Sequence, residues 1–368
     1  MAIPFALIVA ITAVDLSLPD DVHLGPLLVI APALTASIAG PRMTALAGAG
    51  AVVAQLLIGV YHGGLGTPNH MAQVIALAVL STLVVLVSLI KERRHRELSR
   101  ARSVAEAAQR VLLRPPPRRI GALRVSWLYL ASEDEAKIGG DLFAVARAAK
   151  PATRVIIGDV RGKGLGAIGE ASVVLGAFRE GAHRYDGLPE LVSVMEDSLS
   201  RNLEEVGGAD RGEHFVTALV LDLPDGDGPA EMIDCGHPPP LLLHEQGTAV
   251  LPSRHYEPPL GLGELALAGR RAGPFAFVPG DMLVLCTDGV IEARSPAGTF
   301  YPLAERVAGF PATSPEVLLR HIHRDLLDHI GGEPADDAAV LVIERLSADG
   351  SPAGRRTGAK RRAHPSDP

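Results

Sequence analysis

The strongest constraint on the fold of this chain is a stretch of uncharged, apolar sequence that ends abruptly at Ile90. Residues Met71–Ile90 carry no charged side chain and are rich in Leu, Val and Ala. About 20 such residues in a helix are enough to cross the hydrocarbon core of a membrane. The largely basic cluster Lys91–Arg96 follows directly and predicts that this end of the helix lies in the cytoplasm.

Three further apolar segments precede this one, and together they predict an all-α membrane segment of about four helices. Met43–Tyr61 contains glycines suited to close helix packing. Leu24–Gly40 is slightly short. Ile3–Val14 is shorter still, and could be tilted, interfacial or clipped by a late start codon. Counting back from the basic cluster, we expect residues 1–90 to form a multi-pass anchor in the cell membrane, with both ends cytoplasmic. The alternatives are a buried bundle in a soluble protein and a cleaved signal peptide.

Residues 91–114 are expected to form a juxtamembrane linker helix. Its apolar residues recur at helical spacing, at Leu98, Ala101, Ala105, Ala108 and Leu112. This stripe could form a homodimer that relays a signal, or it could pack on the following domain. Three prolines from Pro115 end the helix and mark the start of a domain over residues 115–346. Residues 347–368 are expected to be a disordered basic tail, either solvated or in contact with anionic lipid.

Charge, aromatic content and cysteine spacing exclude several classes of function. The formal net charge of −7 and the aromatic content of 4% argue against nucleic-acid binding. Cys235 and Cys286 have neither metal-ligand spacing nor the Cys-x₅-Arg context of a cysteine phosphatase. We expect them to be buried, reduced thiols in a cytosolic domain. The predicted spans hold no charged residue, which disfavours a transport path.

Two aspartates flank a predicted β-hairpin. Asp141 opens the run Leu142–Arg147, and a turn follows at Ala149–Ala152. The next run, Arg154–Ile157, leads through a glycine into Asp159. Because the two aspartates are nearly equidistant from the turn, strand pairing should bring both carboxylates to the same end of the sheet.

A second pair of acidic positions is predicted near the C-terminus in the same way. The strand Asp281–Cys286 runs out at Asp288. The strand Ala338–Ile343 begins just after Asp336, so the two aspartates share an edge if the strands are antiparallel. Converging carboxylates repel one another unless a cation lies between them, and hard divalent cations prefer oxygen ligands. The sequence therefore predicts a two-metal hydrolase.

The remaining elements between residues 118 and 345 predict a fold of class α+β, in which antiparallel sheets are flanked by helices. Helices are expected at Ala167–His183, Pro189–Leu203 and Ser314–Ile330, and further strands at Leu123–Leu130, Phe215–Leu221 and Glu231–Cys235.

Six short motifs follow one another in this region and carry a resemblance to a known family. They are Gly139-Gly140-Asp141, Gly158-Asp159-Val160-Arg161-Gly162-Lys163-Gly164, Phe215-Val216-Thr217-Ala218, Gly236-His237-Pro238-Pro239-Pro240, Pro279-Gly280-Asp281 with Thr287-Asp288-Gly289-Val290, and Asp336-Asp337-Ala338. The ordered set resembles the type 2C metal-dependent serine/threonine protein phosphatases. More narrowly, it is similar to their bacterial branch, typified by the sporulation phosphatase SpoIIE and by stress-response phosphatases. Each motif alone is weak, whereas six in this order are specific.

The resemblance implies a four-layer α-β-β-α sandwich of two antiparallel sheets, with two Mn²⁺ or Mg²⁺ ions in a cleft at one end. Carried over by position, Asp159 would bind both ions. Asp141 and the carbonyl of Val160 would bind one ion, and Asp288 and Asp336 would bind the other. The four aspartates would be the catalytic set, and a water between the ions would be the nucleophile. The implied substrate is phosphoserine or phosphothreonine on a cytoplasmic regulatory protein such as an anti-anti-sigma factor.

Two positions depart from the pattern of this branch. Ala144 stands where another acidic residue is usual, and Asp234 stands where asparagine is usual. Loss of an acidic contact at Ala144 could weaken one metal site. The alternative function is therefore a pseudophosphatase, a signalling scaffold that binds the same kind of partner, although the four retained aspartates favour an enzyme.

Other polar residues in the motifs have both a functional and a structural interpretation. Arg161 and Lys163 could meet a phosphate group, or Lys163 could serve only the turn and the surface charge. His237 could be a catalytic acid, but the prolines after it favour a structural loop residue. Asp337 is expected to support the neighbouring ligand rather than to bind metal itself.

Overall fold

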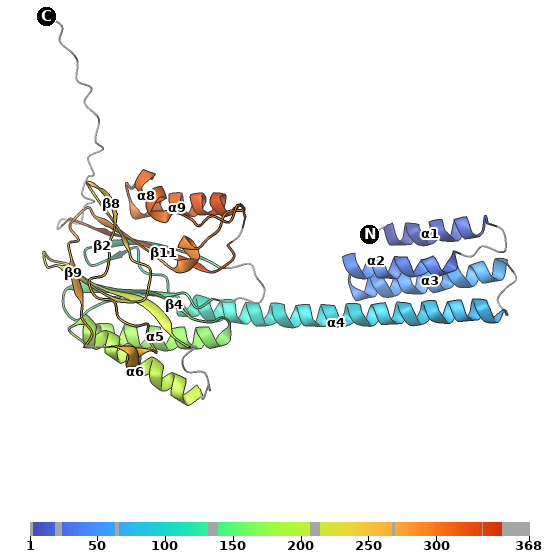
Figure 1. Ribbon diagram of the computed structural model, residues 1–368, viewed down its shortest axis with the longest axis horizontal. Coiled ribbons are helices and arrows are strands. Elements are labelled where there is room, and N and C mark those ends of the chain that lie inside the picture. Colours follow the sequence, from blue (N-terminus) through green and yellow to red (C-terminus); the bar gives the residue numbers. More distant parts are fainter. Residues whose placement is uncertain are drawn as a thin grey trace, which may run out of the picture. The chain divides into compact units, whose positions relative to one another are not determined.

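The computed structural model describes residues 3–18, 24–62, 66–131, 139–206, 214–266, 269–332 and 334–347. The chain divides into two compact units, Met1–Ala101 and Arg102–Pro368 (Figure 1). The predicted basic tail lies outside the described residues, apart from Ser347. The side chains of Leu98, Ala101, Ala105 and Ala108 in the predicted stripe also lie outside them.

The described part of the first unit consists of helices. They are α1 (Ile3–Asp15), the 3-10 helix η1 (Gly25–Val29), α2 (Ile30–Ile38), α3 (Pro41–Tyr61) and the first part of α4 (Pro68–Leu112). Small residues of α3 allow close packing, because a Cβ atom on Gly48 would lie only 3.0 Å from the Cβ of Ser81 in α4. Ala51 and Ile58 of α3 are buried in a small hydrophobic core of this unit.

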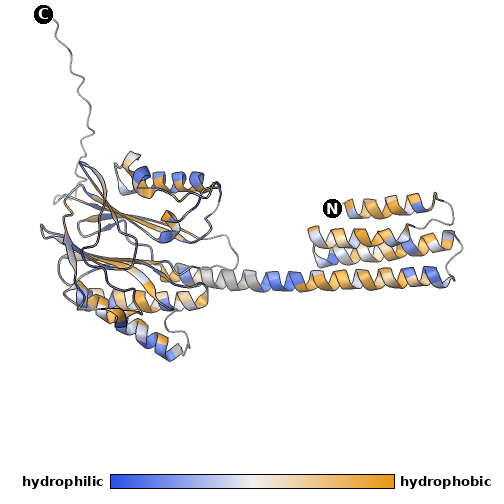
Figure 2. Ribbon diagram, viewed as in Figure 1, coloured by the Kyte–Doolittle hydropathy of each residue, from blue (hydrophilic) through white to orange (hydrophobic). Residues whose placement is uncertain are grey.

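Two of the four predicted spans are long and apolar enough to cross a membrane, judged by length and composition. They are Pro41–Tyr61, of 21 residues, and Pro68–Glu97 within α4, of 30 residues. The other two, Ile3–Asp15 and Gly25–Ile38, are shorter apolar helices. Figure 2 shows apolar residues along these helices and a change to hydrophilic residues farther along α4. The membrane anchor therefore stays a prediction.

The predicted last span and the predicted linker form a single helix, α4, which ends at Leu112. Leu112 is half-buried and packs against the core of the second unit, in which this end of the helix lies. Arg179 also donates a 2.8 Å hydrogen bond to the carbonyl of Leu112. For its last turn, the linker therefore packs on the following domain.

The second unit is built on two antiparallel sheets that face each other, with helices outside both (Figure 1). The six-stranded sheet has the order β1-β2-β11-β10-β7-β8, and the five-stranded sheet has the order β3-β4-β5-β6-β9. The strands are β1 (Arg119–Ile120), β2 (Leu123–Leu130), β3 (Leu142–Arg147), β4 (Ala152–Val160), β5 (Val216–Pro224), β6 (Ala230–Cys235), β7 (Leu241–His244), β8 (Gly247–Val250), β9 (Gly273–Phe275), β10 (Met282–Cys286) and β11 (Ala338–Arg345).

Helices on the two outer faces complete the predicted four-layer α-β-β-α sandwich. Helices α5 (Leu165–Arg184) and α6 (Leu188–Val206) cover the five-stranded sheet, and α8 (Leu303–Gly309) and α9 (Pro315–Ile330) cover the six-stranded sheet (Figure 1). The short helices η3 (Gly263–Leu265) and α7 (Asp288–Ile291) lie in connections. The fold class and the order of the long elements predicted from the sequence are thus confirmed.

Strand β11 shows how the sequence builds these layers. Leu341 and Ile343 belong to the core that the two sheets share, whereas Val340 and Val342 pack with α8 and α9. A strand buried on both faces needs apolar residues at successive positions, which explains the unbroken run Ala338–Ile343.

Candidate metal centre

The predicted hairpin brings Asp141 and Asp159 together. Strands β3 and β4 are antiparallel, and Leu142 pairs with Gly158 at the end of the ladder. Asp141 comes directly before the first of these residues and Asp159 directly after the second, so the two aspartates flank the same pair. A Cβ atom on Gly140 would lie 2.6 Å from the carbonyl oxygen of Val160, so glycine is needed for this close approach.

The second pair of strands places Asp288 beside Asp336 and Asp337 in the same way. Strands β10 and β11 are antiparallel, with Cys286 opposite Val340, and the pairing continues through a hydrogen bond of 3.1 Å from the Thr287 N–H to the carbonyl of Ala339. A Cβ atom on Gly289 would lie 1.8 Å from the carbonyl oxygen of Asp337. Glycine thus lets the segment that carries Asp288 touch the segment that carries the last two aspartates.

Three of the four predicted carboxylates meet where the two sheets face each other. One oxygen from each of Asp141, Asp159 and Asp288 lies within 4.8 Å of the others, and these are the side chains that gather in this way among the described residues. Asp141 is buried, Asp159 is half-buried and Asp288 is exposed. The group is therefore open on one side and enclosed on the other.

Burial and mutual repulsion disfavour the charged forms of these carboxylates. Desolvation and then the nearby Asp159 raise the pKa of Asp141 well above its usual range. Desolvation and then Asp288 raise the pKa of Asp159 to about 7. The pKa of Asp288 is raised as well, by desolvation and then by Glu292. A divalent cation among three such oxygens would offset the repulsion, so this donor set fits the hard cations predicted from the sequence.

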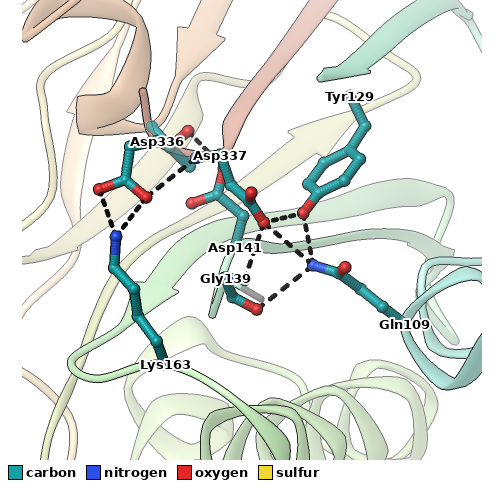
Figure 3. Close-up of polar contacts among 8 residues, drawn as sticks. Gln109, Tyr129, Gly139, Asp141, Lys163, Asp336 and Asp337 are labelled. Carbon is teal, nitrogen blue, oxygen red and sulfur yellow. Dashed lines mark hydrogen bonds and ion pairs between the residues drawn. The ribbon is translucent and has the colours of Figure 1, made fainter. Parts of the chain in front are cut away.

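Asp336, the fourth predicted aspartate, lines one cavity with the other three and forms an ion pair with Lys163. The Lys163 Nζ lies 2.7 Å and 2.9 Å from the two carboxylate oxygens of Asp336 (Figure 3). The side chains of Lys163 and Asp336 are 35% and 55% exposed. Lys163 therefore faces the site instead of projecting from its turn into solvent, and the role of Asp336 as a metal ligand stays a prediction.

A cavity of about 270 Å³ opens over the aspartates. Besides the four predicted aspartates and Asp337, it is lined by the backbone and side chains of Gly139, Gly140, Val160, Arg161, Gly162, Lys163, Phe215 and Thr217. The guanidinium carbon of Arg161 lies 5.1 Å from the centre of the Phe215 ring, which holds this cation at the cavity wall. Two basic side chains therefore border the carboxylates.

Asp337 is buried and holds several segments of the site together. Its Oδ2 accepts hydrogen bonds from the N–H of Gly139, at 3.0 Å, and from the hydroxyl of Tyr129. The amide of Gln109 also donates to it, at 3.4 Å (Figure 3). These contacts agree with the expected supporting role of Asp337. Gln109 and Tyr129 lie outside all six motifs, so the sequence patterns did not indicate them.

The structure favours the loop role of His237. Its side chain is buried, and desolvation lowers the pKa of His237 to about 3, so the ring is neutral at pH 7. The backbone N–H of His237 donates a 3.0 Å hydrogen bond to Oδ1 of Asp234. An asparagine side chain could accept the same bond, so Asp234 preserves this turn. Ala144, the other departure, is buried in the core of the domain.

Comparisons with known proteins agree with this architecture. The family model described as "Stage II sporulation protein E (SpoIIE)" matches residues 150–346. Among curated proteins, Protein IcfG of Synechocystis sp. is 23% identical over 244 residues, which cover 58% of this chain and 37% of that protein. The chain thus corresponds to little more than a third of the length of this relative.

Two solved structures with a TM-score of at least 0.50 illustrate the shared fold. The RsbU and RsbW domains of a Mycobacterium tuberculosis protein give a TM-score of 0.51 at 24% identity, covering 62% of this chain and 61% of that one. The PP2C phosphatase domain of SpoIIE from Bacillus subtilis, with a fragment of its regulatory domain, gives 0.50 at 16% identity, covering 62% and 65%. At these identities the likeness shows the fold.

Proposed function

Because the chain belongs to the stage II sporulation protein E (SpoIIE) family, we propose that it is a metal-dependent phosphatase for phosphoserine or phosphothreonine on a cytoplasmic regulatory protein. The observation that carries this proposal is the meeting of Asp141, Asp159 and Asp288 within 4.8 Å at one end of the sandwich. A cysteine nucleophile is disfavoured, since the thiols of Cys235 and Cys286 are buried and burial raises the pKa of each to about 12.

We assign the roles of the carboxylates from the geometry and the resemblance together. Asp159 lies beside Asp141 and Asp288. By the resemblance, Asp159 would hold both divalent ions. Asp141, with the carbonyl of Val160, would hold one ion, and Asp288, with Asp336, the other. When bound, such ions lower the pKa of a coordinated water and so supply a nucleophile at neutral pH. Asp336 would have to exchange its ion pair with Lys163 for a metal ligand role.

The two basic side chains at the cavity would bind the phosphate. Arg161 is held against Phe215 and presents a planar group with several N–H donors, which suits phosphate oxygens. Lys163, once released from Asp336, has a mobile ammonium that can follow the same oxygens. Both side chains would neutralise substrate charge beside the carboxylates, which would otherwise repel a phosphate.

The proposed location is the cell membrane, with the second unit in the cytoplasm, and the proposed partner is an anti-anti-sigma factor or a similar regulator. The two long apolar helices and the basic cluster after Ile90 support the location. The resemblance to the stress-response branch supports the partner, and one structural relative contains RsbU and RsbW domains in one protein.

Hydrolysis of a phosphopeptide by the purified full-length chain with Mn²⁺ tests the activity. Wild-type protein should be active, and a chelator or Asp159→Asn should abolish the activity. Asp227→Asn is the matched control, because Asp227 is exposed in a turn away from the cavity and should leave the activity unchanged. A wild type that binds Mn²⁺ but is as inactive as Asp159→Asn would instead support the alternative function, a pseudophosphatase. Ala144, which stands where an acidic residue is usual, is the reason for that alternative.

Labelling of introduced cysteines tests the location, and the two buried native thiols give little background. Thr67→Cys, in the loop before α4, should react with a membrane-impermeant maleimide in intact cells. Glu245→Cys, exposed in the second unit, should react only after lysis. Equal labelling of both positions in intact cells would contradict the proposed orientation.

A further inference from the structure

Gln109 is a polar residue in the last turn of α4, in the second unit of the chain. Its side chain is only 5% exposed, although glutamine is usually a surface residue on helices. A buried amide must find hydrogen-bond partners, because a buried polar group without a partner destabilises the folded chain. The partners of Gln109 therefore show what this side chain is held against.

Among the described residues, the acceptors around the Gln109 Nε2 belong to the supporting structure of the metal centre. The amide donates to the hydroxyl of Tyr129 and to the carbonyl of Gly139, the latter at 3.3 Å. It also lies 3.4 Å from Oδ2 of Asp337 (Figure 3). Burial and the charge of Asp337 raise the pKa of Tyr129, so this hydroxyl stays protonated and donates a hydrogen bond to Asp337.

Gly139 connects this network of hydrogen bonds to the predicted metal ligand Asp141. Its carbonyl accepts from Gln109 and its N–H donates to Asp337, so the backbone two residues before Asp141 is held from both sides. A Cβ atom on Gly139 would lie 2.2 Å from Oδ2 of Asp337, so this contact is close. A displacement of Gly139 would therefore move Asp141 relative to Asp159 and Asp288.

We propose that Gln109 is a positioning residue through which the end of α4 sets the geometry of the metal centre. The inference rests on the proposed function, because it concerns the ligands of the metal. Gln109 acts through Gly139 and Asp337 and touches neither the substrate nor the ions. The carbonyl of Leu112, bound by Arg179, keeps the same helix end against α5 and so keeps the amide in reach of its acceptors.

Gln109→Leu in the full-length chain tests the proposal, with the dissociation constant for Mn²⁺ measured by titration calorimetry. Leucine has a similar volume but no amide, so the Gly139 carbonyl and Asp337 lose a donor. Removal of residues that orient metal ligands weakens metal binding by about 10–100-fold, and we expect a loss in this range. The kcat for phosphopeptide hydrolysis should fall at limiting Mn²⁺ and return toward the wild-type value at saturating Mn²⁺.

Val111→Ala is the matched control, because Val111 lies in the same turn and is 74% exposed. It should change neither Mn²⁺ binding nor the metal dependence of kcat. Tyr129→Phe is a second variant, in case Gln109→Leu does not fold, since it removes only the hydroxyl between Gln109 and Asp337. It should also weaken Mn²⁺ binding, and the double variant should bind Mn²⁺ no more weakly than the product of the two single effects predicts.

Unchanged Mn²⁺ affinity in folded Gln109→Leu and in Tyr129→Phe would overturn the proposal, even if the wild type is an active phosphatase. An equal loss of affinity in Val111→Ala would overturn it too, because the effect would then belong to the helix end in general. Failure of the proposed function gives a different result, in which the wild type binds Mn²⁺ without hydrolysing the phosphopeptide and Gln109→Leu still weakens the binding.

Discussion

The hydroxyl of Thr287 donates a 2.8 Å hydrogen bond to Oδ2 of Asp141 and joins the two sheets at the metal centre. Thr287 follows β10 of the six-stranded sheet, whereas Asp141 precedes β3 of the five-stranded sheet. The same hydroxyl accepts a 2.9 Å hydrogen bond from the N–H of Ala339 in β11. The buried side chain of Thr287 thus fixes the carboxylate of Asp141 relative to β10 and β11. Asp288 follows β10, and Asp336 precedes β11.

Thr287→Val should lower the free energy of unfolding of the second unit by about 1–3 kcal/mol, because the N–H of Ala339 is left buried without its acceptor. Trp127 is the single tryptophan of the chain and packs on Phe143 across the sheets, with 5.7 Å between the ring centres. Its fluorescence during urea unfolding of the full-length chain therefore reports on this unit. Thr248→Val, half-buried in edge strand β8, should change the value by less than about 0.5 kcal/mol. Equal losses would argue against the special role of Thr287.

The raised pKa of Asp159 predicts a pH dependence of stability in the presence of a chelator. Its pKa is about 7 in the folded chain and about 4 in an unfolded chain. Between these values the folded chain binds more protons, so this contribution to stability is present at low pH and is lost as the pH rises through 7. Asp159→Asn carries no charge, so its melting temperature should exceed that of the wild type more at pH 8 than at pH 5.

The control for this pH dependence is Asp227→Asn, at an exposed position, where the difference from the wild type should stay constant with pH. Addition of Mn²⁺ at pH 8 should raise the melting temperature of the wild type more than that of Asp159→Asn. A difference between wild type and Asp159→Asn that does not grow with pH would show that Asp159 ionises without penalty.

Two arginine–aspartate pairs of the five-stranded sheet should differ in their effect on stability. Arg154 is 0% exposed, pairs with Asp222, and donates to the carbonyl of Tyr185 at 2.7 Å, where α5 ends. Asp222 keeps Lys150 as a partner in Arg154→Met, at 2.8 Å. The carbonyls of Tyr185 and Asp186 lose their donor, so we expect a loss of about 1–3 kcal/mol for each unpaired group. Arg147 and its partner Asp225 are 34% and 26% exposed, and Arg147→Met should cost about 1 kcal/mol or less. Urea unfolding followed by Trp127 fluorescence would measure both, and similar losses would contradict the burial argument.

Glycine substitutions separate close backbone contact from helix propensity. Gly289→Ala places a methyl group 1.8 Å from the carbonyl oxygen of Asp337, so the metal-centre segments must move apart and Mn²⁺ binding should weaken at least as much as in Gln109→Leu. Gly176→Ala, with nothing within 4 Å of the new methyl group in α5, should instead stabilise the unit by about 0.5–1 kcal/mol. Titration calorimetry with Mn²⁺ and thermal unfolding would measure the two effects. Normal Mn²⁺ binding by Gly289→Ala would show that the contact is not required.

Several elements were predictable because their causes are local in sequence. Strand β2 was predicted with its observed bounds, Leu123–Leu130, since its residues alternate along the run. The short strands β7, β8 and β9 were not predicted, because three or four residues carry too little periodicity to separate them from loops. The first two predicted spans show a similar limit. They form the shorter apolar helices Ile3–Asp15 and Gly25–Ile38, because apolar composition alone does not fix the length of a helix.

The sequence by itself determined the layered fold, the family resemblance and the pairing of Asp141 with Asp159, because the register of a hairpin follows from alternation and distance to the turn. The approach of Asp288 to Asp336 depended on an antiparallel pairing of β10 and β11, which the structure shows. Only the tertiary structure decided how the two sheets meet. The bond from Thr287 to Asp141 joins residues 146 positions apart, and the contact of Gln109 with Asp337 spans 228 positions. No sequence period links such residues. Their approach depends on side-chain packing between layers, and so does the ion pair between Lys163 and Asp336.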